Sequence, residues 1–221
     1  LQSPRKIMVS ITLPDNRMLS FSGPVSGADV ASAIGAGLAK AAIAARVNDE
    51  VWDLERPIEH DARVALITLR DDDDTVYDLL RHDCAHVLAE AVQELYPETQ
   101  VTIGPNVEDG FYYDFSRDEP FTPEDLVKIE ARMMEIVARD EPVKREIWGR
   151  SEAVQFFQDK GEHYKAEIIH GLPKEETVTL YRQGEFVDLC RGPHLPSTGK
   201  LGTSFKLMKV AGAYWRGDSS Q

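Results

Sequence analysis

Two segments, far apart in the chain, carry the residue types that could do chemistry. The first is His82-Asp83-Cys84-Ala85-His86, in which two histidines stand four residues apart, a spacing that puts both on one face of a helix. The second is Asp188-Leu189-Cys190-Arg191-Gly192-Pro193-His194. In a strand, Asp188 and Cys190 would share one face because strand side chains alternate, and the Gly-Pro turn would present His194 at the strand end. We expect the two segments to meet in one cleft.

Imidazole, thiol and carboxylate groups in one cleft allow several chemistries. His82, His86, Cys190 and His194 together suit zinc. Alternatively, Cys190 could be a nucleophile that a histidine activates, or the imidazoles could position and deprotonate a water molecule. A structural interpretation is also open, in which buried histidines are hydrogen-bonded beside two core cysteines. The spacing alone does not separate these possibilities.

The first histidine segment must be held by a long helix. Apolar residues recur at helical spacing from about Asp78 to Tyr96, Pro97 ends the pattern, and Thr75 or Asp78 could cap the start. The rest of residues 71–221 predicts further helices at about 122–139 and 151–160, and strands at 101–103, 111–115, 177–181, 186–190, 205–208 and 213–216. Helices and strands in this mixed order predict an α+β domain.

Residues 1–70 predict a separate small domain of the β-grasp (ubiquitin-like) type. Ser26 and Asp29 have the spacing of a capping box and open a short helix that ends near Gly35 and Gly37. Predicted strands surround it at 7–13, 18–21, 43–47, 50–53 and 64–69. Nothing in this domain looks catalytic, which favours a docking or spacer role. The run Asp71–Asp74 marks the boundary with a second domain, 71–221, as a solvated linker or an acidic flank of the next helix.

Charge and cysteine content restrict the partners and the compartment. The net charge is −13; residues 1–70 hold eight basic and eight acidic side chains, so the whole excess lies in the second domain. Such a surface repels phosphate at long range, so any contact with RNA must be local. The two cysteines do not suggest a disulfide framework, and no membrane span or secretory signal is visible, so we expect a cytoplasmic protein.

The flanking residues decide between the chemistries by resemblance. Gly35-Ala36-Gly37-Leu38-Ala39-Lys40-Ala41 resembles the TGS domain of bacterial threonyl-tRNA synthetases. The two segments above resemble parts of the editing domain of the same family. Four further segments also resemble it, and all six occur in the same order along the chain: Gly110-Phe111-Tyr112-Tyr113-Asp114, Gly161-Glu162-His163-Tyr164-Lys165, Phe205-Lys206-Leu207-Met208-Lys209 and Gly212-Ala213-Tyr214-Trp215-Arg216-Gly217-Asp218. One pair of spaced histidines is weak evidence, whereas this ordered set is strong.

The resemblance implies hydrolysis of serine wrongly attached to threonine tRNA. Serine lacks one methyl group of threonine, which is worth only about 1–3 kcal/mol of discrimination, so a second site must correct the errors. The implied roles are that His82 and His86 orient or deprotonate the attacking water, Lys165 stabilises the developing charge, Asp188 holds the amino group of serine, and Cys190 and His194 line the pocket. Tyr113 would contact the terminal adenosine or close the pocket wall. Lys206, Lys209 and Arg216 form a local basic cluster that could meet the acceptor end of the tRNA or form a solvated strand face.

The resemblance also bears on cofactors and partners. Alanyl-type editing domains hold zinc with a similar residue set, whereas the threonyl type is understood to work without it, so no metal is expected here. We expect zinc and ATP only in a catalytic core that these residues do not include, and as partners the acceptor end of tRNA(Thr) and the remainder of the synthetase. A zinc-dependent alanyl-type deacylase and a non-catalytic module that binds RNA or a protein partner are the alternatives.

Overall fold

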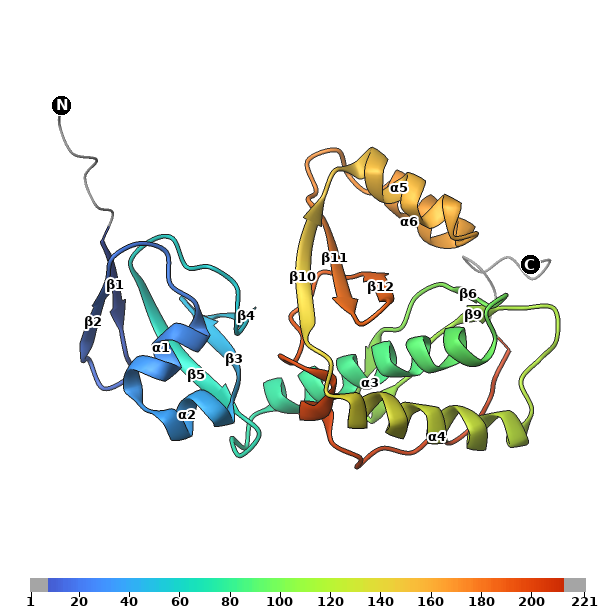
Figure 1. Cartoon of the computed structure of the whole chain (residues 1–221), viewed down its shortest axis with the longest axis horizontal. Helices are drawn as coiled ribbons and strands as arrows, with labels where there is room; N and C mark the ends of the chain where they lie inside the picture. The colour runs from blue at the N-terminus through green and yellow to red at the C-terminus, as the bar shows by residue number, and fades with distance from the viewer. Residues whose placement is uncertain (1–7, 213–221) are drawn as a thin grey trace.

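The computed structural model describes residues 8–212 and comprises a small β-grasp unit and a larger mixed unit (Figure 1). The α+β prediction is confirmed. The boundary at residues 70 and 71 stays a prediction. The strand expected at 213–216, and with it Arg216, lies outside the described residues.

The β-grasp unit is a five-stranded sheet in the order β2-β1-β5-β3-β4. Strands β1 and β5 are parallel, and β1 pairs antiparallel with β2. The strands are β1 (Val9–Thr12), β2 (Met18–Phe21), β3 (Ala42–Val47), β4 (Glu50–Asp53) and β5 (Ala62–Thr68). Helix α1 (Gly27–Ile34) has the predicted capping box of Ser26 and Asp29 and ends at Gly35. A second short helix, α2 (Ala36–Ala41), follows at once and was not predicted.

Helix α3 (Asp74–Leu95) carries the first histidine segment through the centre of the larger unit. It begins at Asp74 rather than Asp78, and the predicted caps Thr75 and Asp78 are wrong. The N-cap is Asp73, whose carboxylate accepts a hydrogen bond from the backbone N–H of Thr75 at 2.8 Å. The acidic run is thus a helix flank, where the helix dipole favours negative charge.

Helix α4 (Pro123–Arg139) lies along α3 (Figure 1). The predicted start is confirmed, because Thr122 and Asp125 form a capping box and Pro123 occupies the first turn. Two small strand pairs stand between α3 and α4 in the chain: β6 (Gln100–Val101) with β9 (Phe115–Ser116), and β7 (Asn106–Val107) with β8 (Gly110–Phe111).

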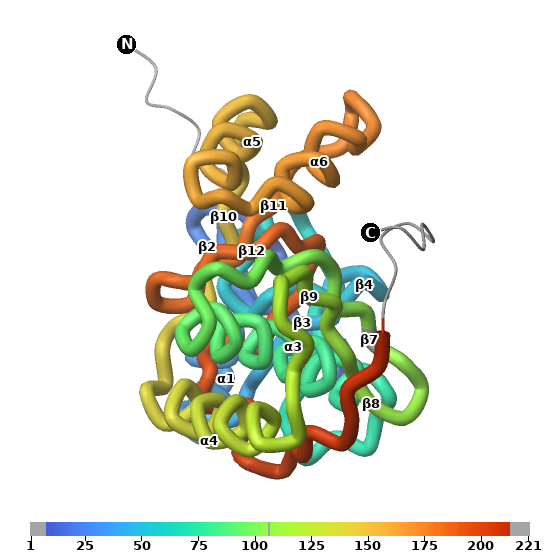
Figure 2. The backbone as a smooth tube through the Cα atoms, turned by 90° about the vertical axis from the view of Figure 1, so that its right-hand side faces the viewer, coloured from blue at the N-terminus to red at the C-terminus, as the bar shows by residue number. Residues whose placement is uncertain are grey.

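A three-stranded antiparallel sheet, β10-β11-β12, carries the second segment. Its strands are β10 (Val143–Trp148), β11 (Val178–Gln183) and β12 (Phe186–Leu189). Helices α5 (Arg150–Asp159) and α6 (His163–Gly171) lie next to this sheet (Figure 2) and share a hydrophobic core with it. The β11–β12 hairpin and α5 agree with the predictions, whereas β10 and α6 were missed. A 3-10 helix, η1 (Thr198–Leu201), follows the sheet.

The strand predicted at 205–208 is wrong, since this stretch has no regular structure. Phe205 and Leu207 are partly buried against the core while Lys206 and Met208 are exposed, so the burial alternates as in a strand. The backbone N–H of Leu207, however, donates to the Glu130 carboxylate of α4 at 2.8 Å. The backbone of Leu207 is therefore hydrogen-bonded to a side chain of α4 and not to the backbone of a neighbouring strand.

The two units share a hydrophobic core. Ile43, Ala44 and Ile67 of the β-grasp sheet belong to the same buried cluster as Val76 and Leu79 of α3. Ala45 and Val47 belong to the cluster beneath α1, so β3 is buried on both faces. No described helix is long and apolar enough to cross a membrane.

Candidate functional site

The structure brings the two predicted segments together around the sulfur of Cys190. The Sγ atom lies 3.0 Å from Nε2 of His82 and 3.3 Å from Nε2 of His194. His86 completes the group, with its ring centroid 5.0 Å from that of His82 and 4.3 Å from that of His194. We call these four residues the His–Cys cluster. Helix α3 supplies two of them and the segment after β12 the other two.

Cys190 and His194 form a charged pair at the centre of the cluster. Burial alone would raise the pKa of the Cys190 thiol, but the nearby His194 charge and hydrogen bonds from His194 and His82 lower it to about 6. Burial opposes a charged imidazole, yet Asp83 and Cys190 together raise the pKa of His194 well above its ordinary value. Both shifts favour the charged forms of the pair, a thiolate beside an imidazolium.

The other two histidines are neutral near pH 7. Burial, followed by the charge of His194, lowers the pKa of His86 to about 3. Burial also lowers the pKa of His82, although the side chain is only partly buried and solvent reaches it. His82 therefore combines a free-base imidazole with access to water, as a general base requires.

Lys165, Asp188 and Tyr113 form a second buried group beside the cluster. The Lys165 ammonium lies 2.5 Å from the Asp188 carboxylate and also donates to the Thr102 carbonyl at 2.6 Å and the Tyr113 hydroxyl at 3.1 Å. Tyr113 donates to Asp188 at 2.6 Å. Lys165 is thus not a solvated surface lysine but one of the most deeply buried side chains of the fold.

The Asp188 carboxylate links this group to the His–Cys cluster, since its Oδ2 lies 3.7 Å from Nδ1 of His86. Burial favours the neutral acid, but Lys165, then His86, and hydrogen bonds from Lys165 and Tyr113 lower the pKa of Asp188. The carboxylate is therefore ionised, and its partners are protein groups. The expected contact with a substrate amino group stays a prediction.

Two residues that the sequence reasoning did not select also shape the cluster. Asp83, which is buried, lies 3.4 Å from Nδ1 of His194 and accepts the backbone N–H of Leu195. The ring of Tyr181 packs 4.3 Å from that of His194. Gly192 has a φ of 72°, and a Cβ there would overlap the Tyr181 hydroxyl, so only glycine fits. Asp83 stands inside the first segment, so the sequence could have indicated its role. Nothing in the sequence around Tyr181 indicates its contact with His194.

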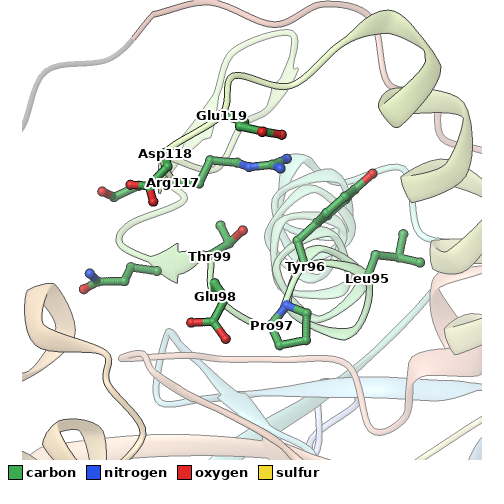
Figure 3. A pocket seen from close by; sticks show the side chains of 10 residues that line it. Leu95, Tyr96, Pro97, Glu98, Thr99, Arg117, Asp118 and Glu119 are labelled. Carbon is green, nitrogen blue, oxygen red and sulfur yellow. The ribbon is translucent and has the colours of Figure 1, made fainter.

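The basic residues predicted to contact RNA are not members of the His–Cys cluster. Lys206 is exposed and pairs with Glu130 at 3.0 Å, Lys209 is exposed, and Arg216 is outside the described residues. Their proposed contact with RNA stays a prediction. A hollow of about 580 Å³, lined by residues of 95–100 and 116–119, lies at the C-terminal end of α3 and includes no member of the His–Cys cluster (Figure 3).

The donor set of the His–Cys cluster also fits a metal. One ligand atom from each of its members lies within 4.8 Å of the others, and three imidazoles with one thiolate suit tetrahedral zinc. Carboxylates stand behind two of the imidazoles, Asp83 behind His194 and Asp188 behind His86, as is common for histidines that bind metal. The geometry therefore allows both water chemistry and zinc.

Comparison with known proteins identifies the family. The TGS domain family matches residues 9–68, and the family described as the threonyl and alanyl tRNA synthetase second additional domain matches residues 178–221. The threonine--tRNA ligases of Rhodospirillum rubrum, Paramagnetospirillum magneticum and Thiobacillus denitrificans are 64%, 63% and 62% identical over 96% of this chain. This chain belongs to the threonyl-tRNA synthetase family. It corresponds to the N-terminal region of those enzymes. It spans about a third of the length of those three relatives.

The threonyl-tRNA synthetase resemblance seen in the sequence is therefore confirmed, as are its two parts, a TGS domain and an editing-type domain. The editing-type family match begins at the first residue of β11 and includes β12, Cys190 and His194.

Proposed function

We propose that this chain hydrolyses the ester bond of seryl-tRNA(Thr) and so removes serine attached in place of threonine. The observation that carries the proposal is the His–Cys cluster, in which a solvent-accessible His82 lies 3.0 Å from the Cys190 sulfur, with His194 on the same sulfur atom, beside an editing-type family match. The names of the relatives supply threonine and its tRNA, and the choice of serine rests on the resemblance to the editing domain.

In the proposed reaction, His82 accepts a proton from a water molecule whose oxygen attacks the ester carbonyl carbon. The carbonyl then reforms, the bond to the ribose oxygen breaks, and the proton passes to that oxygen. The products are serine and free tRNA. A positioned general base of this kind contributes roughly 10²–10⁴-fold to rate.

Lys165 acts on the developing negative charge in this proposal. Its ammonium group makes three short contacts with protein acceptors, so its contribution is a fixed positive potential rather than a new hydrogen bond. Asp188 supplies the opposite charge for the ammonium of serine, and Cys190 and His194 form the wall that rejects the methyl group of threonine. Tyr113 supports the wall and Asp188 from behind.

The proposed substrate is the acceptor end of tRNA(Thr), and the reaction needs neither ATP nor zinc. Lys206, Lys209 and Arg216 are the proposed contacts to the RNA. Other phosphate contacts would come from the remaining length of the synthetase, so this chain alone should bind tRNA weakly.

A zinc-dependent alanyl-type deacylase is the second candidate, because the cluster offers four suitable ligands. Hydrolysis of seryl-, threonyl- and alanyl-tRNA by the purified chain, with and without a zinc chelator, tests both. Loss of serine that the chelator does not affect, with threonine spared, supports the proposal. Loss abolished by the chelator assigns the zinc mechanism. The absence of any hydrolysis leaves a non-catalytic module or a domain that needs the rest of the synthetase to present its substrate.

A further inference from the structure

One side chain of the β-grasp unit reaches the candidate site. Asp53, the last residue of β4, accepts a hydrogen bond from the backbone N–H of His194 at 2.9 Å through Oδ1. Its Oδ2 accepts from the Tyr181 hydroxyl at 2.7 Å. The side chain is 14% exposed, so both bonds are largely shielded from water.

Asp53 and Asp83 hold neighbouring points of the same loop. Asp53 takes the N–H of His194, and Asp83, from α3, takes the N–H of Leu195 at 3.2 Å. The loop that carries His194 is therefore fixed by carboxylates from two different units of the chain. Tyr181, which Asp53 also holds, packs its ring 4.3 Å from that of His194.

The position of the His194 ring decides the geometry of the cluster. Its Nε2 lies 3.3 Å from the Cys190 sulfur, within hydrogen-bonding distance of a sulfur atom. Hydrogen bonds to a charged acceptor are stronger than neutral ones, and small misplacements of a reacting group cost large factors in rate. The two hydrogen bonds of Asp53 fix the backbone of His194 and the ring of Tyr181, which packs against the His194 ring.

We propose that Asp53 is a positioning residue of the editing site, through which the β-grasp domain holds His194 against Cys190. This inference rests on the proposed function. It gives the first domain a part in hydrolysis that its sequence did not suggest, since no residue of 1–70 looked catalytic.

The variants that test this are Asp53→Ala, which removes both bonds, and Asp53→Asn. The asparagine oxygen can still accept the N–H of His194, and its amide can donate to the Tyr181 hydroxyl. The matched control is Glu55→Ala, which removes an exposed carboxylate two residues along the same chain segment. Thermal unfolding of each variant of the 221-residue chain establishes which variants are folded at the assay temperature.

The first readout is single-turnover hydrolysis of seryl-tRNA(Thr) over a range of enzyme concentrations. We expect Asp53→Ala to lower the maximal rate about tenfold or more with half-saturation changed less than about twofold. Asp53→Asn should restore most of the rate, and Glu55→Ala should match wild type. A folded Asp53→Ala variant with the wild-type rate, or equal losses in all three variants, would overturn the inference.

The second readout, alkylation of Cys190 by iodoacetamide at pH 7, needs no substrate. We expect Asp53→Ala to change this rate at least about threefold, because a displaced His194 no longer makes its 3.3 Å contact with the Cys190 sulfur, while Asp53→Asn and Glu55→Ala keep it. A change here without any hydrolysis by wild type would leave the positioning role standing and remove the proposed function. An unchanged rate in folded Asp53→Ala would remove the positioning role itself.

Discussion

The Lys165 ammonium and the Asp188 carboxylate lie 2.5 Å apart, and both side chains are almost completely buried. The two residues come from α6 and β12, elements that share one small hydrophobic core. Two opposite charges in such a position compensate each other, and Tyr113 satisfies a further acceptor site. The pair therefore both supports the fold and sets the charge beside His86.

Removing either partner of this pair should destabilise the protein strongly. Lys165→Met or Asp188→Asn leaves the other member buried without its counter-ion, which costs about 3–5 kcal/mol. The double variant should cost less than the two single losses together. Urea unfolding measures each value. Lys206→Met, which removes an exposed lysine paired with Glu130, should change stability by less than about 1 kcal/mol. Similar losses for the buried and exposed lysines would contradict this.

The two cysteines should differ sharply in reactivity. The pKa of Cys190 is lowered to about 6, whereas burial, with a smaller contribution from Asp83, raises the pKa of Cys84 to about 12. Because the thiolate is the reactive form, iodoacetamide should modify Cys190 with a half-maximal rate near pH 6 and leave Cys84 untouched at pH 8. Mass spectrometry of the two peptides measures this. His194→Gln should move the Cys190 midpoint upward; a wild-type midpoint above pH 8 would contradict the charged pair.

Glu90 should make the protein less stable as pH rises. Burial raises the pKa of this carboxyl to about 7 in the folded state, against 4.5 as its ordinary value. Between these two pH values the folded state keeps a proton that the unfolded state has lost. The free energy of unfolding should therefore fall through this window, by on the order of 3 kcal/mol.

The matched comparison for Glu90 is between Glu90→Gln and Glu98→Gln. Glu90→Gln removes the titration of a carboxyl that accepts a hydrogen bond from Gln183 at 2.6 Å, so its stability should depend less on pH and exceed that of wild type at pH 8. Glu98→Gln changes an exposed carboxyl group and should leave the dependence of stability on pH as it is in wild type. Parallel profiles for wild type and Glu90→Gln would exclude Glu90 as the cause.

Local signals in the sequence predicted part of the fold well. The capping boxes at Ser26 and Thr122 each use residues three positions apart, so a short stretch of sequence contains the whole interaction. Helix α6 was missed because its N-cap, Glu162, makes no side-chain capping bond. Strand β10 was missed because none of its residues is fully buried: four are partly buried and two, Lys144 and Ile147, are exposed, so the strand has no clear alternation of buried and exposed side chains.

The candidate site was predictable in its members but not in its charges. The spacing in each segment brought His82, His86, Cys190 and His194 together. The burial of Lys165 depends on α6 packing against the sheet, and nothing in its own segment indicates that. Asp53 was missed because 141 residues separate it from His194, and only the docking of the two units brings them together.

The central claim is that the imidazole of His82 carries the hydrolysis, and single-turnover deacylation of seryl-tRNA(Thr) by three variants tests it most directly. His82→Ala and His82→Gln remove the proton acceptor, and each should lower the rate by roughly 10²–10⁴-fold. His60→Ala removes an exposed histidine of the β-grasp unit and should keep the wild-type rate. Wild-type hydrolysis that survives in folded His82→Ala and His82→Gln would contradict the account.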